Sequence, residues 1–290
     1  MPTIAEAITR GSHKLDAAGI DQALLTAGLL LRFVLGVDRT YLLTRADEEI
    51  DQTRYRRYLS LIDRRAAGEP AQYLIGYQEF YGLDFVVSPD VLIPRSETEF
   101  LVERVLKLVD DHPLESPLIV DVGTGSGCIA VTLAVKLQQA RVIATDVSRS
   151  ALQIASTNAA NHGVTDRIDF LEGDLLDPLD SRSVDAVDIV ASNPPYVEER
   201  SRDELQREVR DWEPQSALFG GADGLDFYRR LVIEARRYLK ADGHLVLEVG
   251  YGQLDAIGEM LPGLGWEVID VIRDLQDIPR VLTLQRCSTK

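Results

Sequence analysis

The sequence predicts an α/β protein in which a mostly parallel sheet, covered by helices on both faces, follows a small helical domain. Two observations predict this. After Pro94, short apolar runs alternate with helical patterns, as they do where each strand is followed by a helix that crosses back over the sheet. Before Ala67, apolar residues recur at helical spacing instead. A chain of 290 residues suits one α/β domain of roughly 200 residues with a smaller partner.

The N-terminal segment, residues 1–70, is predicted to be the helical domain. Six apolar residues recur at spacings that place a stripe on one side of a helix: Leu24, Leu25, Leu29, Leu31, Val34 and Leu35. The apolar stretch from Ala23 to Val37 contains Arg32 and is shorter than the ~20 residues that span a bilayer. We therefore expect a buried helix and no membrane partner.

A β-hairpin is predicted to link the two domains, over residues 71–92. The composition changes there to aromatic and β-branched residues with glycines, in Tyr73-Leu74-Ile75-Gly76 and in Phe80-Tyr81-Gly82-Leu83-Asp84-Phe85. Residues 93–290 then form the α/β domain.

Seven strands are predicted for the sheet of this domain. Five apolar runs separated by helical patterns indicate parallel strands: Leu118–Val122, Arg141–Thr145, Ile168–Leu171, Asp188–Ala191 and His244–Val249. Two final runs, Trp266–Ile272 and Arg280–Leu284, are joined by a short loop with Pro279. We expect them to finish the sheet as an antiparallel pair.

The charge and the cysteines limit the classes of function. A formal net charge of -16 repels phosphate backbones, so a nucleic-acid partner is disfavoured, although a local basic patch can hide in an acidic total. Cys128 and Cys287 form no ligand cluster and no disulfide framework, which favours the cytoplasm. The histidines show no metal-ligand spacing, so we expect no metal site.

The first candidate site is a glycine-rich loop after a strand, Asp121-Val122-Gly123-Thr124-Gly125-Ser126-Gly127. Its glycines allow the backbone to turn sharply and to approach a ligand, and the helix that follows presents free N–H groups. A dinucleotide fingerprint starting at Gly123 requires Gly or Ala where Cys128 stands, which disfavours a nicotinamide cofactor. The alternative is a tight turn that binds no ligand.

Three further residues are candidates for cofactor binding. Asp146 ends the next strand, about 20 residues on, where nucleotide-binding sheets place a carboxylate for the ribose hydroxyls. Asp174 and Leu175 follow the strand after that, where an acid could accept from an adenine amino group and leucine could pack on the ring. The alternatives are a turn aspartate at position 146 and a solvent-facing loop aspartate at position 174.

The most informative motif is Asn193-Pro194-Pro195-Tyr196, directly after a strand. Prolines have no backbone N–H but keep their carbonyls. Asn193 can offer its side-chain carbonyl and Pro194 its backbone carbonyl to the two hydrogens of a planar NH₂ group, on which Tyr196 can stack. The alternative is an ordinary proline-rich turn.

Two such acceptors would help an amide nitrogen to react, because this nitrogen is a poor nucleophile. Its lone pair is delocalised by the resonance that gives peptide bonds a rotation barrier of about 18–20 kcal/mol. Two acceptors favour a more pyramidal nitrogen, and alignment with a sulfonium methyl group could recover up to about 7–11 kcal/mol by positioning. The glycine loop and the tetrapeptide together indicate a nitrogen methyltransferase, with Asn193, Pro194, Pro195 and Tyr196 as its catalytic residues. Asn193 is also expected to contact the cofactor. A cofactor-binding adaptor without catalysis is the alternative from another class.

Two more segments qualify as parts of the site. In Pro94-Arg95-Ser96-Glu97-Thr98-Glu99, Ser96 and Glu99 fit a helix capping box, whereas Pro94-Arg95 could cover the cofactor pocket. The glycine-rich residues from Glu213 to Leu225 could form a mobile wall of the substrate site, or a simple turn around Asp223.

Taken together, these segments resemble the peptide chain release factor N5-glutamine methyltransferase family over nearly the whole chain. The likeness also includes Gln72-Tyr73-Leu74-Ile75-Gly76, Val91-Leu92-Ile93-Pro94-Arg95 and Leu247-Glu248-Val249-Gly250. It implies a class I, Rossmann-like methyltransferase sheet with S-adenosyl-L-methionine bound at Gly123–Gly127 and Asp146. It further implies a substrate-docking role for the N-terminal domain, class 1 release factors as partners, and their Gly-Gly-Gln glutamine held by Asn193 and Pro194.

Two positions depart from this family. Ser96 stands where the family more often has proline, a change also seen in relatives that methylate a glutamine of ribosomal protein L3. Leu175 stands where an aromatic residue is common. Methylation of ribosomal protein L3 is therefore one alternative. Methylation of a nucleic-acid adenine or guanine amino group is another, since those enzymes share the Asn-Pro-Pro-Tyr motif but need a basic groove.

Overall fold

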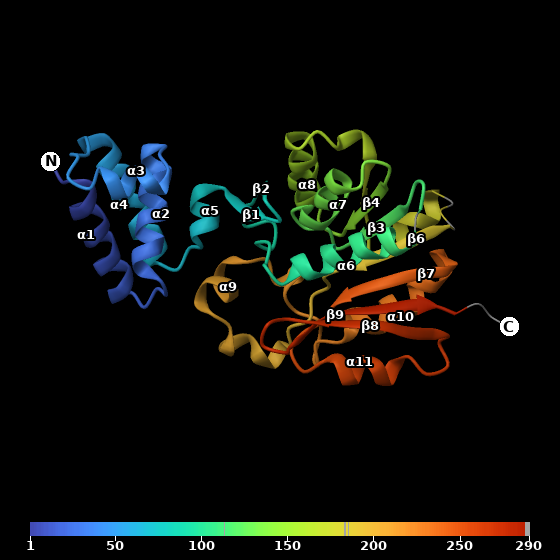
Figure 1. The fold of residues 1–290 in the computed structure, drawn as a ribbon. Coiled ribbons are helices and arrows are strands. Elements are labelled where there is room, and N and C mark those ends of the chain that lie inside the picture. The colour runs from blue at the N-terminus through green and yellow to red at the C-terminus, as the bar shows by residue number, and fades with distance from the viewer. Residues whose placement is uncertain (113, 183, 185, 288–290) are drawn as a thin grey trace. The chain divides into compact units, whose positions relative to one another are not determined.

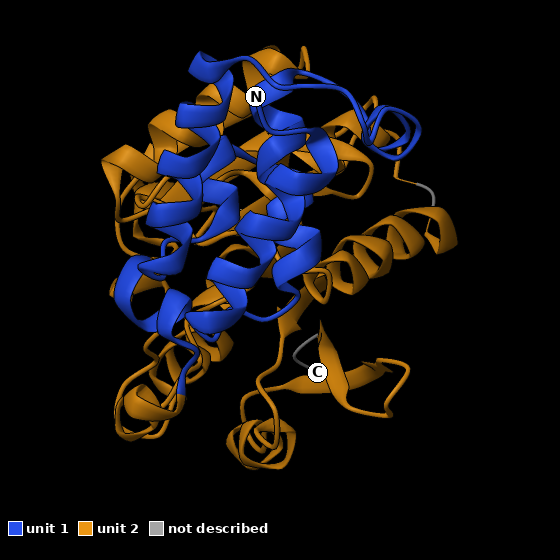
Figure 2. Ribbon diagram, turned by 90° about the vertical axis from the view of Figure 1, so that its left-hand side faces the viewer, with its two compact units in different colours: residues 1–77, 205–212 blue, residues 78–204, 213–290 orange. Residues whose placement is uncertain are grey.

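The structure is a computed structural model that describes residues 1–112, 114–182, 184 and 186–287. The chain forms two compact units (Figure 2). Unit 1 comprises residues 1–77 and 205–212, and unit 2 comprises residues 78–204 and 213–290. The segment 205–212 therefore belongs to the helical unit although it comes from the middle of the α/β sequence.

Unit 1 is helical, as predicted. Its helices are α1 (Ile4–Ala17), α2 (Ala23–Leu35), α3 (Arg39–Thr44), α4 (Gln52–Ala66), α5 (Ala71–Ile75) and α9 (Arg207–Trp212). Thr3 and Glu6 form a capping box at the start of α1, and the Asp51 side chain accepts from two backbone N–H groups of α4. Such caps satisfy donors that a helix start leaves free. Leu15, Leu30 and Tyr58 are fully buried in the core of this unit.

The buried face of α2 differs from the predicted stripe. Ala23, Ala27, Leu30, Leu31 and Val34 face the core, and their spacing is that of one face of a helix. Leu24 and Leu25, which were expected in the stripe, are 61% and 56% exposed. The helix is apolar nearly all round, so its apolar pattern did not specify which face is buried.

The predicted hairpin is present, but it is shorter than predicted. Strands β1 (Tyr77–Phe80) and β2 (Leu83–Val86) pair with each other, whereas residues 71–75, expected in the hairpin, form helix α5, which ends at Gly76 in the left-handed region. Asn158 of helix α8 (Arg149–Asn161) binds both backbone groups of Val86, at 2.8 and 3.0 Å. The same side chain donates to the Ser126 carbonyl at 2.8 Å, so the hairpin and the glycine loop share one anchor.

Unit 2 contains the predicted seven-stranded sheet (Figure 1). Its strands are β3 (Leu118–Val122), β4 (Arg141–Asp146), β5 (Ile168–Glu172), β6 (Val187–Ser192), β7 (Leu239–Glu248), β8 (Trp266–Arg273) and β9 (Pro279–Arg286). They lie in the order β5-β4-β3-β6-β7-β9-β8. Neighbours from β5 to β7 are parallel, and β9 pairs antiparallel with both β7 and β8. The predicted antiparallel ending is confirmed.

Helices cover both faces of this sheet, as predicted. They are α6 (Thr98–Asp111), α7 (Cys128–Lys136), α8 (Arg149–Asn161), α10 (Asp226–Tyr238) and α11 (Leu254–Met260), with 3₁₀ turns η1 (Thr165–Arg167), η2 (Asp177–Arg182), η3 (Glu199–Glu204) and η4 (Gln215–Ala217). Ile119 of β3 packs with residues of α6, α7 and α8, whereas Val120 packs with residues of α10 and α11. Successive side chains of a strand point to opposite faces, so each buried strand supplies both cores.

The predicted capping box at the start of α6 is wrong. The helix begins at Thr98 after Glu97, and no side chain caps it. The Ser96 hydroxyl donates to Glu97 instead, and the Glu99 carboxylate accepts from the backbone N–H of Tyr81 at 2.9 Å. The Glu99 side chain therefore binds the turn of the hairpin. The local sequence pattern could not reveal this contact, because Tyr81 lies 18 residues away.

Candidate functional site

The glycine loop and the tetrapeptide lie at the same edge of the sheet. Parallel pairing places Val122 of β3 opposite Thr145 of β4 and Ser192 of β6. The Ser192 hydroxyl also donates to the Val122 carbonyl at 2.8 Å. Residues that follow these strands therefore meet at their carboxyl ends, where open α/β sheets bind their ligands.

The glycine loop connects β3 to α7 in a conformation that leaves room beside its backbone. Gly125 has a φ of 55°, and a Cβ built on it would meet nothing within 4 Å. Gly127 also has positive φ, but a Cβ there would lie 3.0 Å from the Cβ of Ala155. Gly125 thus allows close approach of a ligand, whereas Gly127 allows close packing of α7 against α8.

Asp121, at the start of this loop, is fully buried. Its Oδ2 accepts from the Thr124 hydroxyl at 2.6 Å and from the backbone N–H of Ala130 at 3.1 Å. Its Oδ1 has no hydrogen-bond partner among the described residues. Burial raises the pKa of this carboxyl to about 7. An orphaned buried acceptor of this kind fits a ligand that donates from an amino group.

Asp146, the last residue of β4, holds the glycine loop from the neighbouring strand. One of its oxygens, Oδ2, accepts from the backbone N–H of Gly125 at 2.9 Å, and Oδ1 accepts from that of Ser148 at 2.8 Å. Burial raises the pKa of Asp146. Each carboxylate oxygen keeps further lone-pair capacity, so the side chain could also accept from two hydroxyl groups.

The pair predicted to contact adenine has other partners in the structure. Both oxygens of Asp174 bind Nη1 of Arg230, at 3.0 and 2.9 Å. Leu175 has a φ of 44° and is buried in the same cluster as Val122 and Ile143. Their contact with an adenine ring stays a prediction.

The tetrapeptide is tied to two residues that the sequence did not single out as functional. Asn193 Nδ2 donates to Thr98 Oγ1 at 3.1 Å, and Thr98 Oγ1 donates to Glu248 Oε2 at 2.7 Å. The Tyr196 hydroxyl reaches Glu248 Oε1 at 3.4 Å. The one available signal was a carboxylate, Glu248, in an otherwise apolar strand end, Leu245–Val249.

The segment from Glu213 to Leu225 forms a wall beside the tetrapeptide. Val197 bridges to Phe219, and a Cβ on Gly220 would lie 2.4 Å from the carbonyl oxygen of Pro195. The Tyr196 carbonyl accepts from Gln253 Nε2 at 2.9 Å. The expected proximity to the substrate motif is thus confirmed, and Gly220 is needed because any side chain would displace the Pro195 carbonyl.

The expected cover formed by Pro94-Arg95 is attached to the same wall. Glu213 is buried, and its Oε1 pairs with Arg95 Nη2 at 2.6 Å, while its Oε2 accepts from the backbone N–H of Ile93 at 3.4 Å. Whether Pro94-Arg95 cover a cofactor stays a prediction.

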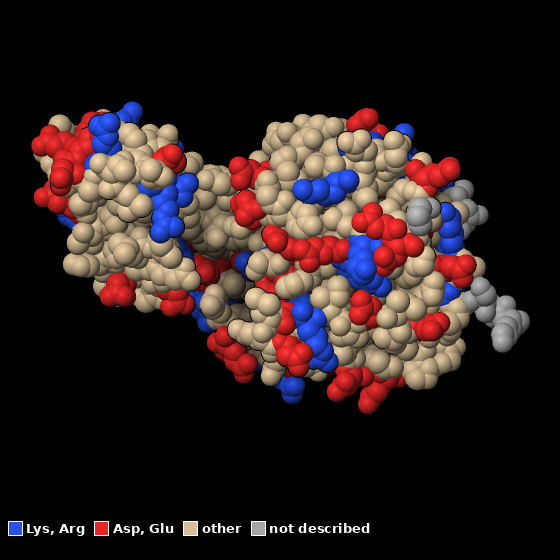
Figure 3. Space-filling model, viewed as in Figure 1, with Lys and Arg blue, Asp and Glu red and all other residues tan. Residues whose placement is uncertain are grey.

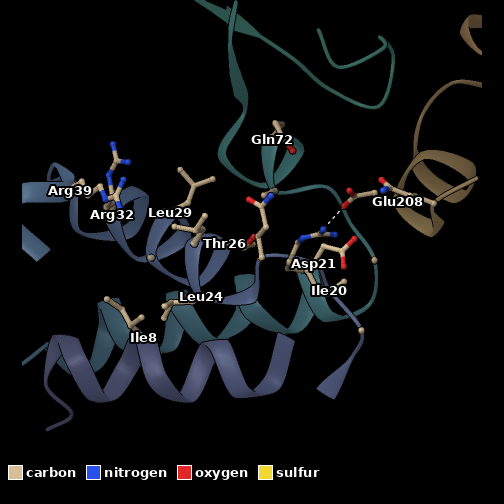
Figure 4. A pocket seen from close by; sticks show the side chains of 18 of the residues that line it. Ile8, Ile20, Asp21, Leu24, Thr26, Leu29, Arg32, Arg39, Gln72 and Glu208 are labelled. Atoms are coloured by element: carbon tan, nitrogen blue, oxygen red, sulfur yellow. Dashed lines mark ion pairs between the residues drawn. The ribbon is translucent and has the colours of Figure 1, made fainter. Parts of the chain in front are cut away.

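Unit 1 contains a separate cavity of about 940 Å³. Ile8, Leu24 and Leu29 are among the apolar side chains that line it, and Arg32 and Arg39 are among the arginines (Figure 4). Arg65 also lines it. Arg65 forms an ion pair with Glu208 of α9, which Figure 4 marks with a dashed line. The exposed α2 leucines thus lie at a hollow that also presents guanidinium groups.

Comparison with known proteins decides the family. Residues 6–76 match the family model described as PrmC N-terminal domain, and residues 96–209 match the one described as Methyltransferase small domain. A release factor glutamine methyltransferase of Koribacter versatilis is 44% identical over 97% of this chain and 97% of its own length. One from Moorella thermoacetica is 42% identical over 98% of this chain and 97% of its own. The chain belongs to the release factor glutamine methyltransferase family.

Solved structures support the fold of this family member. A methyltransferase from Pyrococcus furiosus covers 72% of this chain and 91% of its own, with a TM-score of 0.51 at 19% identity. The hMettl16 catalytic domain in complex with MAT2A 3′UTR hairpin 1 covers 86% of this chain and 88% of its own, with a TM-score of 0.55 at 18% identity. The sheet is thus the class I methyltransferase sheet.

Family membership makes the protein a methyltransferase that uses S-adenosyl-L-methionine. The residues at the sheet edge fit this cofactor. The loop leaves space at Gly125, Asp146 offers a carboxylate for hydroxyl groups, and the orphaned Oδ1 of Asp121 offers an acceptor for an ammonium group. These acceptors match a nucleoside that carries an amino acid.

Three further observations concern metal ions, membranes and nucleic acid. Within the described residues, no three His, Cys, Asp or Glu side chains are grouped so that they could hold a metal ion, and no helix is long and apolar enough to cross a membrane. On the face drawn in Figure 3, acidic groups are spread over both units with basic groups between them. The expectation that nucleic acid is no direct partner stays a prediction.

Proposed function

We propose that this family member methylates the side-chain amide nitrogen, N5, of the glutamine in the Gly-Gly-Gln motif of class 1 peptide chain release factors, and so supports translation termination in the cytoplasm. One observation carries the proposal. Asn193 Nδ2 is bound to Thr98, and Asn193 Oδ1 accepts no hydrogen bond from any described residue. An amide acceptor thus stands next to the carbonyl of Pro194, and the pair matches the two hydrogens of a primary amide.

The tetrapeptide would act by holding and orienting the glutamine amide. Asn193 Oδ1 and the Pro194 carbonyl accept its two N–H groups, so the nitrogen lone pair is directed out of conjugation and toward the cofactor. The two prolines fix the backbone φ angles and add no competing N–H donor. Tyr196, anchored at its hydroxyl to Glu248, offers its ring face to the amide plane. These residues supply positioning, which can account for several orders of magnitude in rate.

The cofactor would be held by the loop and the carboxylates of the sheet edge. Gly123, Thr124, Gly125, Ser126 and Gly127 line the approach to the N-terminus of α7. Asp146 accepts from the ribose hydroxyls, while Asp174 and Leu175 contact the adenine. When bound, S-adenosyl-L-methionine supplies a methyl group on a positively charged sulfur, so the protein itself needs no nucleophile or metal.

The proposal is tested by incubating the purified protein with methyl-labelled S-adenosyl-L-methionine and a class 1 release factor. We expect one methyl group per release factor, located by mass spectrometry on the motif glutamine. A release factor with that glutamine replaced by alanine is the matched control and should take up no label.

Four outcomes would contradict the proposal. No label on the wild-type release factor, or equal label on the alanine control, would exclude the motif glutamine as acceptor. Stronger labelling of ribosomal protein L3 in a parallel reaction would move the substrate to that protein. Efficient methylation of DNA or RNA would show that a nucleic-acid amino group is the acceptor.

The helical N-terminal domain, predicted as residues 1–70, would dock the protein substrate. Its cavity combines exposed leucines with arginines, and two buried guanidinium nitrogens, Arg32 Nε and Arg65 Nε, have no hydrogen-bond partner among the described residues. Unpaired buried donors favour a partner that brings acceptors. We propose that an apolar segment of the release factor with adjacent acidic side chains occupies this cavity.

Replacing both Leu24 and Leu25 by serine is expected to raise the KM for the full release factor by about 5- to 20-fold, because the two leucines together would lose apolar contact worth about 1–2 kcal/mol. The kcat should change little. The KM for a short synthetic peptide that contains the Gly-Gly-Gln motif should also stay unchanged.

The matched control is Leu275→Ser, which replaces a leucine that is fully exposed in unit 2. It should leave both KM values unchanged. An equal KM for the release factor in wild type and the double variant would show that this cavity does not dock the substrate.

A further inference from the structure

Three side chains from distant parts of the chain form one hydrogen-bonded series in unit 2. Asn193 follows β6, Thr98 is the first residue of α6, and Glu248 is the last residue of β7. The series joins Asn193 Nδ2 to Thr98 Oγ1 at 3.1 Å and Thr98 Oγ1 to Glu248 Oε2 at 2.7 Å. Thr98 and Glu248 are each 2% exposed, so water cannot readily substitute for either partner.

The number of hydrogens in this series fixes its direction. An ionised carboxylate can only accept, so the Thr98 hydroxyl must donate its single hydrogen to Glu248. The hydroxyl oxygen can then only accept from Asn193. The amide of Asn193 must therefore present Nδ2 to Thr98, and its Oδ1 must point the other way. The reversed amide would place two acceptors against each other in a buried site, which is costly.

We infer that Thr98 and Glu248 are positioning residues that lock the side-chain amide of Asn193 with its carbonyl oxygen toward the substrate. The inference rests on the proposed function, in which that oxygen accepts from the glutamine amide. Without the lock, the two orientations of Asn193 differ little in shape, and the reversed one would present a donor to the substrate NH₂ group. The substrate nitrogen would then lose one of its two acceptors.

A structural role alone does not explain a carboxylate at position 248. The side chain is buried against α6, and burial raises the pKa of Glu248 to about 7. An apolar residue would avoid this desolvation. What Glu248 adds is an acceptor without a hydrogen, and this is the property that sets the direction of the series.

The state of Glu248 should therefore control the lock. The charged and titratable groups that act on it are Glu97, Tyr196, Arg280, Cys128 and Tyr228. Burial raises the pKa values of the cysteine and of both tyrosines, so these three stay neutral near pH 7. Once protonated, Glu248 can donate to Thr98, and the hydroxyl is then free to donate to Asn193 Oδ1. The lock should weaken as the pH falls through about 7.

Thr98→Val tests this inference, because valine keeps the shape of threonine and removes the hydroxyl. We expect kcat with a release factor to fall by about 10- to 100-fold, while the dissociation constant of S-adenosyl-L-methionine, measured by calorimetry, stays unchanged. Thr98→Ser should restore most of the lost activity. Thr132→Val is the matched control, because Thr132 is also buried in a helix and its hydroxyl has no partner among the described residues.

Glu248→Gln provides a second test through the pH profile. Glutamine carries its own donor at every pH, so kcat should be reduced on the alkaline side and the fall near pH 7 should disappear. The inference would be overturned if Thr98→Val had the kcat and the pH profile of the wild type. It would also be overturned if Thr98→Val and Thr98→Ser lost kcat equally. The latter would show that packing alone matters.

A readout independent of the substrate separates this inference from the proposed function. In protein labelled with ¹⁵N-asparagine, the Nδ2 resonance of Asn193 should shift as the pH passes through about 7 in wild type and should not do so in Glu248→Gln. It should also move in Thr98→Val. A resonance that is insensitive to both changes would overturn the lock even if release factors are methylated. A resonance that responds as expected, with no methylation by wild type, would refute the proposed substrate and leave the lock established.

Discussion

Asn193→Ala is expected to lower kcat for glutamine methylation by about 10²- to 10³-fold, the loss that follows removal of one preorganised hydrogen-bonding group from an active site. The alanine variant cannot accept from the glutamine NH₂ group, so the amide keeps its resonance and the nitrogen stays a poor nucleophile. The affinity for S-adenosyl-L-methionine should change by less than about threefold, because in the proposed site most contacts to the cofactor come from the glycine loop and Asp146. Calorimetry measures this affinity separately from kcat.

The matched control for this variant is Asn161→Ala, at the exposed end of α8. It should behave as wild type in both assays. In Asn193→Ala, Thr98 loses the amide that donates to it but keeps its bond to Glu248, so the thermal midpoint should fall modestly. Unchanged methylation by Asn193→Ala would contradict the role of the tetrapeptide. Unchanged partner function without any methyl transfer would instead favour a cofactor-binding adaptor.

The sequence predicted the sheet well because each strand has a strong local signal. Leu118–Val122 is a short apolar run followed at once by glycines, and the structure begins and ends β3 at these residues. The strand His244–Val249 was predicted too short, since β7 begins at Leu239. Lys240, Ala241 and Asp242 are exposed and residue 243 is a glycine, so their sequence resembles a loop. The pairing of β7 with β6 is irregular across this stretch, because it shifts from Val187 opposite Leu239 to Ile189 opposite His244.

The two candidate runs that the sequence singled out are each continuous in the chain, and the structure brings them close together. Asn193–Tyr196 and Gly123–Gly127 are contiguous, and the parallel sheet brings them to one edge. The series that holds Asn193 could not be predicted, because Thr98 lies 95 residues before Asn193 and Glu248 lies 150 residues after Thr98. A local rule assigned the residues around Thr98 to a capping box. The tertiary partners of Thr98 and Glu99 determined their roles instead.

The second large effect is expected at the cofactor. Asp146→Ala should weaken binding of S-adenosyl-L-methionine by about 100-fold, which corresponds to loss of two hydrogen bonds to a charged group at about 1.5 kcal/mol each. The same change removes the acceptor for the backbone N–H of Gly125 and that of Ser148, so the loop should also become less ordered. Isothermal titration calorimetry measures the affinity directly.

Acid pH should reproduce part of this effect in the wild-type protein. Burial raises the pKa of Asp146, and a protonated carboxyl loses half of its capacity to accept, so cofactor affinity should fall as the pH is lowered through that raised pKa. In Asp146→Ala, the part of the pH dependence of cofactor affinity that comes from this carboxyl should be absent. The matched control is Asp169→Ala, on the exposed side of the adjacent strand β5, which should bind as wild type does. Equal affinities for all three proteins would place the ribose elsewhere and would leave Asp146 with only its loop contacts, in which case the thermal midpoint would still fall in Asp146→Ala.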